Sequence, residues 1–173
     1  MIALDTNILV HARREEAQHH ASAVRLLSDL AEGDEPWSLP WPCVYEFLRV
    51  VTHPRVFSPP TDLEAALEDL SVLFEAPSLT LLGEGPNHRV LLHDVLSMAR
   101  TTGNLVHDGH IAVLLREHAV REFWTTDRDF ARFSGIRTRN PFLTRDLHEP
   151  RATSRSPAWP GRAPVRKRSS ARR

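Results

Sequence analysis

Four short apolar runs, each followed by polar or turn-forming residues, recur along the first 143 residues of the chain. They cover residues 2–5, 37–39, 79–82 and 123–125. Runs of this length are typical of strands that are buried on both faces. The pattern therefore predicts four buried strands spread over this segment.

Between these runs, apolar residues recur at intervals of three and four, which predicts amphipathic helices. Thr61, with Glu64 three positions on, is the predicted N-cap of the third helix. The helices are expected over residues 17–30, 42–51, 62–74, 90–99 and 108–118, with a helical turn at 129–133. Strands that alternate with helices pair in parallel through right-handed crossovers. We therefore expect an α/β fold with helices on both faces of a parallel sheet.

The composition fits one soluble globular domain: 173 residues, 41% of them hydrophobic and 25% charged. No run approaches the roughly 18 consecutive apolar residues of a membrane helix, and the N-terminus lacks the pattern of a signal peptide. A single cysteine, Cys43, excludes an intramolecular disulfide and a zinc site built from several cysteines. These features predict a cytoplasmic protein without a membrane segment.

The formal net charge of zero hides an asymmetry. Residues 1–143 hold 13 Arg and 20 Asp or Glu, a net charge of −7, whereas residues 144–173 hold 9 Lys or Arg and 2 acids, a net charge of +7. The second segment is rich in Pro, Ser and Arg, and its one aromatic residue is Trp159. We therefore expect a folded domain over residues 1–143 and a disordered basic tail over 144–173, which is either a solvated extension or an arm for nucleic acid.

Four carboxylates are expected at one edge of the predicted sheet, because open parallel sheets bind ligands at the carboxyl ends of their strands. Asp5 ends the first strand, and Asp127 follows the fourth strand by two residues. Glu46 lies in the first turns of the helix after Pro42, and Asp108 opens the helix that begins there. The sequence thus predicts that acids from four separate elements converge.

Each of these acids also has a purely structural interpretation. Asp5 and Asp108 suit helix N-caps, Glu46 suits a solvated helix face and Asp127 suits a turn. Carboxylates that cluster repel one another, however, so that one takes up a proton near neutral pH unless a cation is present. Oxygen ligands suit Mg²⁺ or Mn²⁺, which also bind phosphates. The cluster predicts a hard-cation site for phosphodiester chemistry.

Three stretches carry a resemblance to a known family: Ile2–Leu9, Asn104–Ala112 and Thr125–Phe130, which read IALDTNIL, NLVHDGHIA and TTDRDF. Together they resemble the PIN-domain ribonucleases, and among these the VapC toxins of bacterial toxin–antitoxin modules. The resemblance covers roughly residues 1–142, and the order and spacing of the stretches make it specific.

This resemblance implies a three-layer fold around a parallel sheet of four to five short strands, and an Mg²⁺-dependent endoribonuclease in which Mn²⁺ can substitute. The residues that match the family's acidic quartet, and so are its expected metal ligands and catalytic residues, are Asp5, Glu46, Asp108 and Asp127. Asp129 is an alternative to Asp127. The polar positions that support the acids are matched by Thr6, Asn7 and Thr125.

The resemblance also implies partners. The substrate would be RNA, and a cognate antitoxin protein would block the site, with an arginine paired to the acids. A homodimer through an apolar helix face is expected as well. From the residues themselves, His107 is expected to shape the pocket, and a metal role for His107 and His110 stays open. Arginines that can line the RNA-binding rim are Arg13, Arg14, Arg49, Arg55 and Arg128.

Two other functions compete with this interpretation. An aspartate-nucleophile phosphatase also places an aspartate after its first strand, but it needs a second acid two residues later, where Asn7 stands. It needs a lysine near the site too, and the chain's one lysine, Lys167, lies in the tail. A PIN-like module that binds or docks RNA without cutting it is the second alternative.

Overall fold

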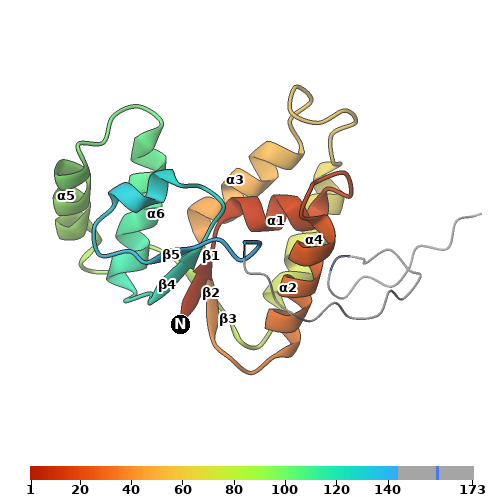
Figure 1. The fold of residues 1–173 in the computed structure, drawn as a ribbon, viewed down its shortest axis with the longest axis horizontal. Helices are drawn as coiled ribbons and strands as arrows, with labels where there is room; N and C mark the ends of the chain where they lie inside the picture. Colours follow the sequence, from red (N-terminus) through yellow and green to blue (C-terminus); the bar gives the residue numbers. More distant parts are fainter. Residues whose placement is uncertain (144–158, 160–173) are drawn as a thin grey trace, which may run out of the picture.

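The computed structural model describes residues 1–143 and Trp159. Short strands alternate with helices through the described chain (Figure 1). In chain order the elements are β1 (Ile2–Leu4), α1 (Thr6–Arg13), α2 (His20–Glu32), β2 (Trp37–Pro40), α3 (Trp41–Val51), α4 (Leu63–Phe74), β3 (Leu79–Leu82), α5 (His88–Ala99), α6 (Leu105–Glu117), β4 (Glu122–Trp124), a 3₁₀ turn η1 (Asp129–Arg132) and β5 (Thr138–Arg139). The predicted α/β class is confirmed.

All five strands are parallel and lie in the order β3-β2-β1-β4-β5. From β1 to β3 the chain moves across the sheet in one direction, and it then returns to the other side of β1 to form β4. The strand order therefore reverses between β1 and β4, and such a switch point leaves a crevice at the carboxyl ends of the two strands. Leu4 pairs with Trp124, so Asp5 and Thr125 are the next residues at that edge.

Helices cover both faces of the sheet, as expected from right-handed crossovers that run in opposite directions. In Figure 1 the sheet lies between α5 and α6 on one side and α1, α2 and α4 on the other. Helix α3 contacts α1, α4 and α6, so it reaches both helical groups. This arrangement places the first turns of α3 and α6 near the switch point.

The strands lie close to their predicted positions, but the starts of two helices differ from the prediction by three residues. Helix α6 begins at Leu105, three residues before the predicted start, because Leu105 packs against the core and anchors an additional turn. Asp108 therefore lies in the first turn and is not the N-cap. Helix α2 begins at His20 and not at residue 17. The sequence predicted the helix after Asp5 only through its N-cap. The structure shows it as α1, a helix of eight residues.

The predicted N-cap of α4 was also wrong by one residue. Asp62 caps this helix, and its carboxylate accepts the backbone N–H groups of Glu64 and Ala65. Thr61 is buried, and its hydroxyl accepts a hydrogen bond from the Arg14 guanidinium at 3.1 Å. The Thr61 side chain is thus engaged in tertiary contact and not in capping.

The core joins both helical layers to the sheet, and its largest fully buried side chains include Trp37, Phe47 and Phe123. Trp159 belongs to the same core: its side chain is 5% exposed, and its ring lies 5.9 Å from that of Phe47. Its indole N–H donates to the backbone carbonyl of Asp69 at 2.9 Å. The expectation of a solvated tail does not hold at Trp159, and the rest of residues 144–173 lies outside the described residues.

No helix among the described residues is both long enough and apolar enough to cross a membrane.

Candidate active site

The four predicted acids line a single cavity of about 290 Å³ at the switch point of the sheet. Asp5 follows β1, Asp127 follows β4, Glu46 lies on α3 and Asp108 on α6. The structure therefore brings together side chains from four elements, including residues more than 100 positions apart in the sequence. Apolar or aromatic walls are supplied by Val10, His11, Val50 and Phe130.

Asp5 is held at the floor of this cavity by hydrogen bonds to both of its carboxylate oxygens. Oδ1 accepts the backbone N–H of Thr6 at 2.7 Å, which makes Asp5 the N-cap of α1. Oδ2 accepts hydrogen bonds from the side chains of Asn7 and Thr125. The structural interpretation of Asp5 as an N-cap is thus correct, and the same residue also faces the acidic cavity.

Burial raises the pKa of Asp5 from 3.8 to about 7, and the nearby negative charges of Glu46 and Asp127 act in the same direction. Hydrogen bonds from Thr125 and Thr6 oppose the rise. A carboxyl group that is 5% exposed and half-protonated near neutral pH is in an environment that favours a bound cation. An Asp with both oxygens held in this way is also a poor nucleophile, which argues against the phosphatase alternative.

Glu46 lies at the wall of the cavity and is anchored by three side chains. Its Oε2 accepts from the Thr6 hydroxyl at 3.2 Å and from His107 Nε2 at 3.1 Å, and its Oε1 accepts from Arg49 at 2.9 Å. The hydrogen bond from His107 is the main cause that lowers the pKa of Glu46 to about 2. The pKa of His107 is correspondingly raised by this bond. The expected role of His107 in shaping the pocket is consistent with this contact.

Asp108 and Asp127 complete the ring of acids. Burial raises the pKa of Asp108, and the charge of Asp127 adds to the rise. Asp127 Oδ1 accepts the backbone N–H of Asp129 at 2.8 Å, and the Asp129 carboxylate forms an ion pair with Arg132. Asp127 lines the cavity and Asp129 is not among its lining residues. The geometry thus favours Asp127 as the fourth acid.

The cavity suits a hydrated hard cation. Its acidic donors are carboxylate oxygens. Burial is the main cause that raises the pKa values of Asp5 and Asp108, and the charges of the neighbouring acids add to the rise. Among the described residues, no three of the four acids bring ligand oxygens within 4.8 Å of one another. Mg²⁺ retains several waters and is commonly held by one or two carboxylates, so this wider spacing fits the ion with part of its hydration shell.

Two of the five candidate rim arginines are engaged elsewhere. Arg13 forms an ion pair with the fully buried Asp69 at 2.7 Å. Arg14 contacts Glu16 and lies over the Phe57 ring at 4.1 Å. These two were therefore predicted wrongly: Arg13 pairs with an acid of α4, and Arg14 contacts the loop before α4. Arg49, Arg55 and Arg128 are exposed, and Arg49 lines a depression that includes Glu46 and Asp108.

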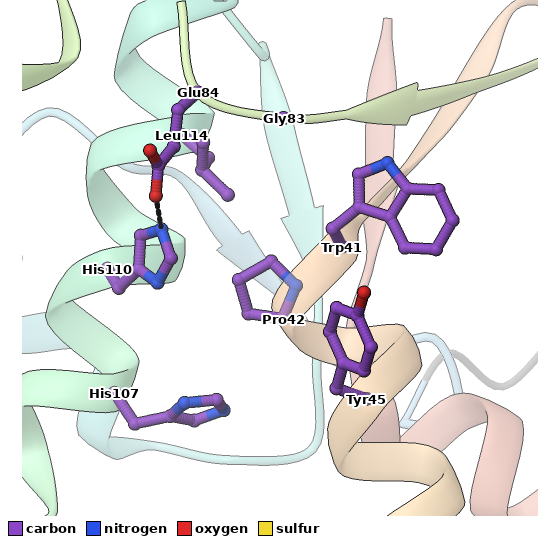
Figure 2. Close-up of a pocket in the computed structure, with 8 residues that line it drawn as sticks. All are labelled: Trp41, Pro42, Tyr45, Gly83, Glu84, His107, His110 and Leu114. Atoms are coloured by element: carbon purple, nitrogen blue, oxygen red, sulfur yellow. Dashed lines mark ion pairs between the residues drawn. The ribbon is translucent and has the colours of Figure 1, made fainter.

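Sequence reasoning missed a second cavity beside the first, of about 530 Å³ (Figure 2). Trp41 and Tyr45 of α3 form one wall, and His107 and His110 of α6 form the other. Glu84, in the loop after β3, points toward His110. No pattern in the sequence connects Glu84 with His110, because their proximity depends on how β3 and α6 pack.

Comparison with known proteins identifies the family. The family model described as "PIN domain" matches residues 2–136. The chain is 35% identical over 138 residues to Ribonuclease VapC48 of Mycobacterium tuberculosis. The aligned region covers 80% of this chain and 95% of the relative. It is 36% identical over 141 residues to VapC ribonuclease Mb2897 of Mycobacterium bovis. Here the aligned region covers 82% of this chain and 95% of the relative.

Solved structures share the fold. VapBC2 from Rickettsia felis, bound to a DNA fragment from its promoter, matches with a TM-score of 0.58 and 18% identity over 81% of this chain and 98% of that chain. FitAcB from Neisseria gonorrhoeae matches with a TM-score of 0.57 and 22% identity over 83% of this chain and 100% of that chain. At these identities the likeness concerns the arrangement of the strands and helices.

Proposed function

Since this chain belongs to the PIN-domain family and its similar relatives are named VapC ribonucleases, we propose that it is an Mg²⁺-dependent endoribonuclease, the toxin of a toxin–antitoxin pair. The observation that carries the proposal is the convergence of Asp5, Glu46, Asp108 and Asp127 on one cavity at the switch point. Ribonuclease activity follows from the family and its relatives; the metal and the role of each residue rest on this geometry.

The four acids would hold the metal, with Asp5 and Asp108 as the principal ligands. Burial, together with the negative charges of neighbouring acids, raises the pKa of both carboxyl groups, and a bound cation would offset both effects. When bound, Mg²⁺ supplies charge stabilisation to the phosphoryl oxygens and lowers the pKa of a coordinated water. Asn7 and Thr125 hold the Asp5 carboxylate in place, and Asn7 Oδ1 in turn accepts the Thr126 backbone N–H at 3.3 Å. The Asp5 oxygens are thereby oriented before any ligand arrives.

Asp127 is the better candidate for accepting a proton from the attacking water. Glu46 has both oxygens occupied by hydrogen bonds and a pKa of about 2, so it is a weak base. Asp127 is exposed at the mouth of the cavity, with Oδ1 fixed by the Asp129 backbone N–H. Glu46 instead keeps His107 and Arg49 at the rim, where positive groups would meet the phosphate backbone.

The test is cleavage of total cellular RNA by purified protein, with Mg²⁺ and with a chelator. Asp5→Asn and Asp108→Asn are expected to reduce the cleavage rate by about 10²-fold or more, and Asp127→Asn by a similar factor. Asp129→Asn and Asp94→Asn are matched controls that keep activity, because Asp129 does not line the cavity and Asp94 is an exposed residue of α5. Sequencing of the new 5′ ends would identify the target RNA.

Cleavage that persists with the chelator, or in both the Asp5→Asn and Asp108→Asn variants, would contradict the metal mechanism. RNA that is bound but never cut across the whole pool would favour the non-catalytic module instead.

The antitoxin partner belongs to the same proposal, and a basic side chain from it would neutralise the acidic cavity. A homodimer is supported by exposed apolar side chains on two helices: Trp41 and Tyr45 on α3, and Val90 and Met98 on α5. Light scattering on the purified chain tests the dimer, and a mass consistent with one chain would exclude it. A cytoplasmic location completes the proposal, because the RNA substrate lies there.

A further inference from the structure

A second cluster of metal-ligating side chains lies where the loop after β3 meets α5 and α6. Glu84 is in the loop, His88 is the first residue of α5, and His110 is on α6. One ligand atom of each residue lies within 4.8 Å of those of the other two. None of these residues belongs to the acidic quartet, and Glu84 and His110 line the larger cavity shown in Figure 2.

His110 has a buried nitrogen that no hydrogen bond satisfies. Its Nε2 lies 3.4 Å from Glu84 Oε1, close enough for an ion pair but without hydrogen-bond geometry. Leaving such a nitrogen unpaired beside a carboxylate is costly, and a cation between the two groups would satisfy both.

His88 is held in the manner that is typical of metal-ligating histidines. Its Nδ1 lies 3.0 Å from Glu117 Oε2, and Glu117 also accepts the backbone N–H groups of Gly85 at 3.1 Å and Asn87 at 2.9 Å. The contact with Glu117 engages Nδ1 of His88 and leaves Nε2 as the ring nitrogen available to a ligand. Carboxylate–histidine pairs of this kind orient imidazoles toward metals.

Gly85 allows this carboxylate to approach the backbone. A Cβ atom at position 85 would lie 2.6 Å from Glu117 Oε1. The loop residues 84–87 therefore bring together a ligand, Glu84, and the backbone donors that fix Glu117.

We propose that Glu84, His88 and His110 bind one divalent transition-metal ion such as Zn²⁺, at a site separate from the acidic quartet. Two imidazoles and one carboxylate suit Zn²⁺, whereas the oxygen-only cavity suits Mg²⁺. The ion joins three segments, and one of them is α6, which also carries His107 and Asp108. Its role is to hold α6 against α5 and the loop after β3.

The test is Zn²⁺ titration of the full metal-free chain by calorimetry, with folding checked by circular dichroism. Wild type is expected to bind one Zn²⁺ per chain at this site, and Zn²⁺ is expected to raise its melting temperature. Glu84→Gln should weaken binding at least tenfold and, because Glu84 is 66% exposed, should leave the fold intact. The double variant His88→Gln/His110→Gln should lose the site.

Two controls separate this site from others. His93 lies on α5 with His88, and its side chain is 83% exposed, so His93→Gln should bind Zn²⁺ as wild type does. Asp108→Asn should keep this binding event although it impairs the acidic site. Absence of Zn²⁺ binding in wild type, affinity unchanged in Glu84→Gln and the double variant, or loss of binding in Asp108→Asn would each overturn the proposal.

Discussion

The hydroxyl of Thr125 donates a hydrogen bond to the carboxylate of Asp5 across 120 positions of sequence. The same hydroxyl oxygen accepts the side-chain N–H of Asn7 at 3.1 Å and the backbone N–H of Asp127 at 2.9 Å. One small polar side chain at the end of β4 thus connects the acid that follows β1 with the acid that follows β4. The spacing of these two acids depends on it.

We predict that Thr125→Val destabilises the protein and weakens Mg²⁺ binding, because a methyl group of similar size removes three hydrogen bonds. The loss in free energy of unfolding should be about 1–3 kcal/mol, since buried polar partners are left unpaired. Chemical denaturation measures the stability, and calorimetry measures Mg²⁺ affinity. Thr125→Ser keeps the hydroxyl and should lie close to wild type in both; equal losses in the two variants would show that the methyl group, not the hydroxyl, matters.

The raised pKa of Asp5 predicts an unusual pH dependence in the metal-free protein. In the unfolded chain Asp5 ionises near 3.8, but in the folded chain it stays protonated up to about 7. The folded state therefore binds more protons between these values, and the contribution of Asp5 to the free energy of unfolding falls as pH rises from about 4 to 7. The fall should amount to a few kcal/mol, because one pKa unit corresponds to about 1.4 kcal/mol.

Denaturation curves at several pH values, compared between wild type and Asp5→Asn, isolate this contribution. The difference in free energy of unfolding between wild type and Asp5→Asn should change between about pH 4 and pH 7 and level off above pH 7. Mg²⁺ should restore part of the lost stability in wild type alone, because it binds the ionised carboxylate. A constant difference across the window would contradict the raised pKa.

The contact between His107 and Glu46 predicts a specific change in titration. His107→Ala should raise the pKa of Glu46 from about 2 toward 4.5, because the main hydrogen bond to its carboxylate is lost. Arg49→Ala should raise it less, since the Arg49 side chain is 65% exposed and its bond is the weaker cause. Carboxyl chemical shifts followed by NMR in the metal-free protein would measure both. A larger rise in the pKa of Glu46 in Arg49→Ala than in His107→Ala would contradict this prediction.

Because Trp159 is buried in the core, we predict that part of the basic tail stabilises the nuclease domain. Trp159→Ala should lower the free energy of unfolding by about 1–3 kcal/mol, because a buried indole and its hydrogen bond to Asp69 are lost. Trp159→Phe keeps an aromatic ring beside Phe47, so its free energy of unfolding should lie between those of wild type and Trp159→Ala. A chain that ends after Leu143 should match the alanine variant. Identical stability of all four proteins would show that the docking contributes nothing.

The sheet and its acids at positions 5 and 127 could be predicted because a general rule connects them. Parallel strands present their carboxyl ends at one edge, so acids that follow strands converge wherever the strands pair. The apolar runs were enough to locate those strands, and β5, with two residues, was too short for any pattern to mark. The start of α6 was predicted less well because core packing of Leu105, and not local sequence, determines it.

The finer contacts of the site could not be predicted, because each depends on helix docking. His107 meets Glu46 only because α3 and α6 touch, and Arg13 leaves the rim only because Asp69 is buried beneath it. Trp159 was assigned to a solvated tail because composition averaged over thirty residues conceals one aromatic side chain that has a place in the core.

The adjacency of β1 and β4 bears on how the enzyme is made. During translation the acids at positions 5, 46 and 108 leave the ribosome first. Strand β1 can then pair with β2, but it lacks its second neighbour until residues 122–124 have emerged. Prematurely terminated chains that end before this strand lack Asp127 and the hydroxyl that orients Asp5. We therefore expect chains that end before β4 to lack nuclease activity, because the acidic cavity is incomplete without Asp127 and the Thr125 hydroxyl.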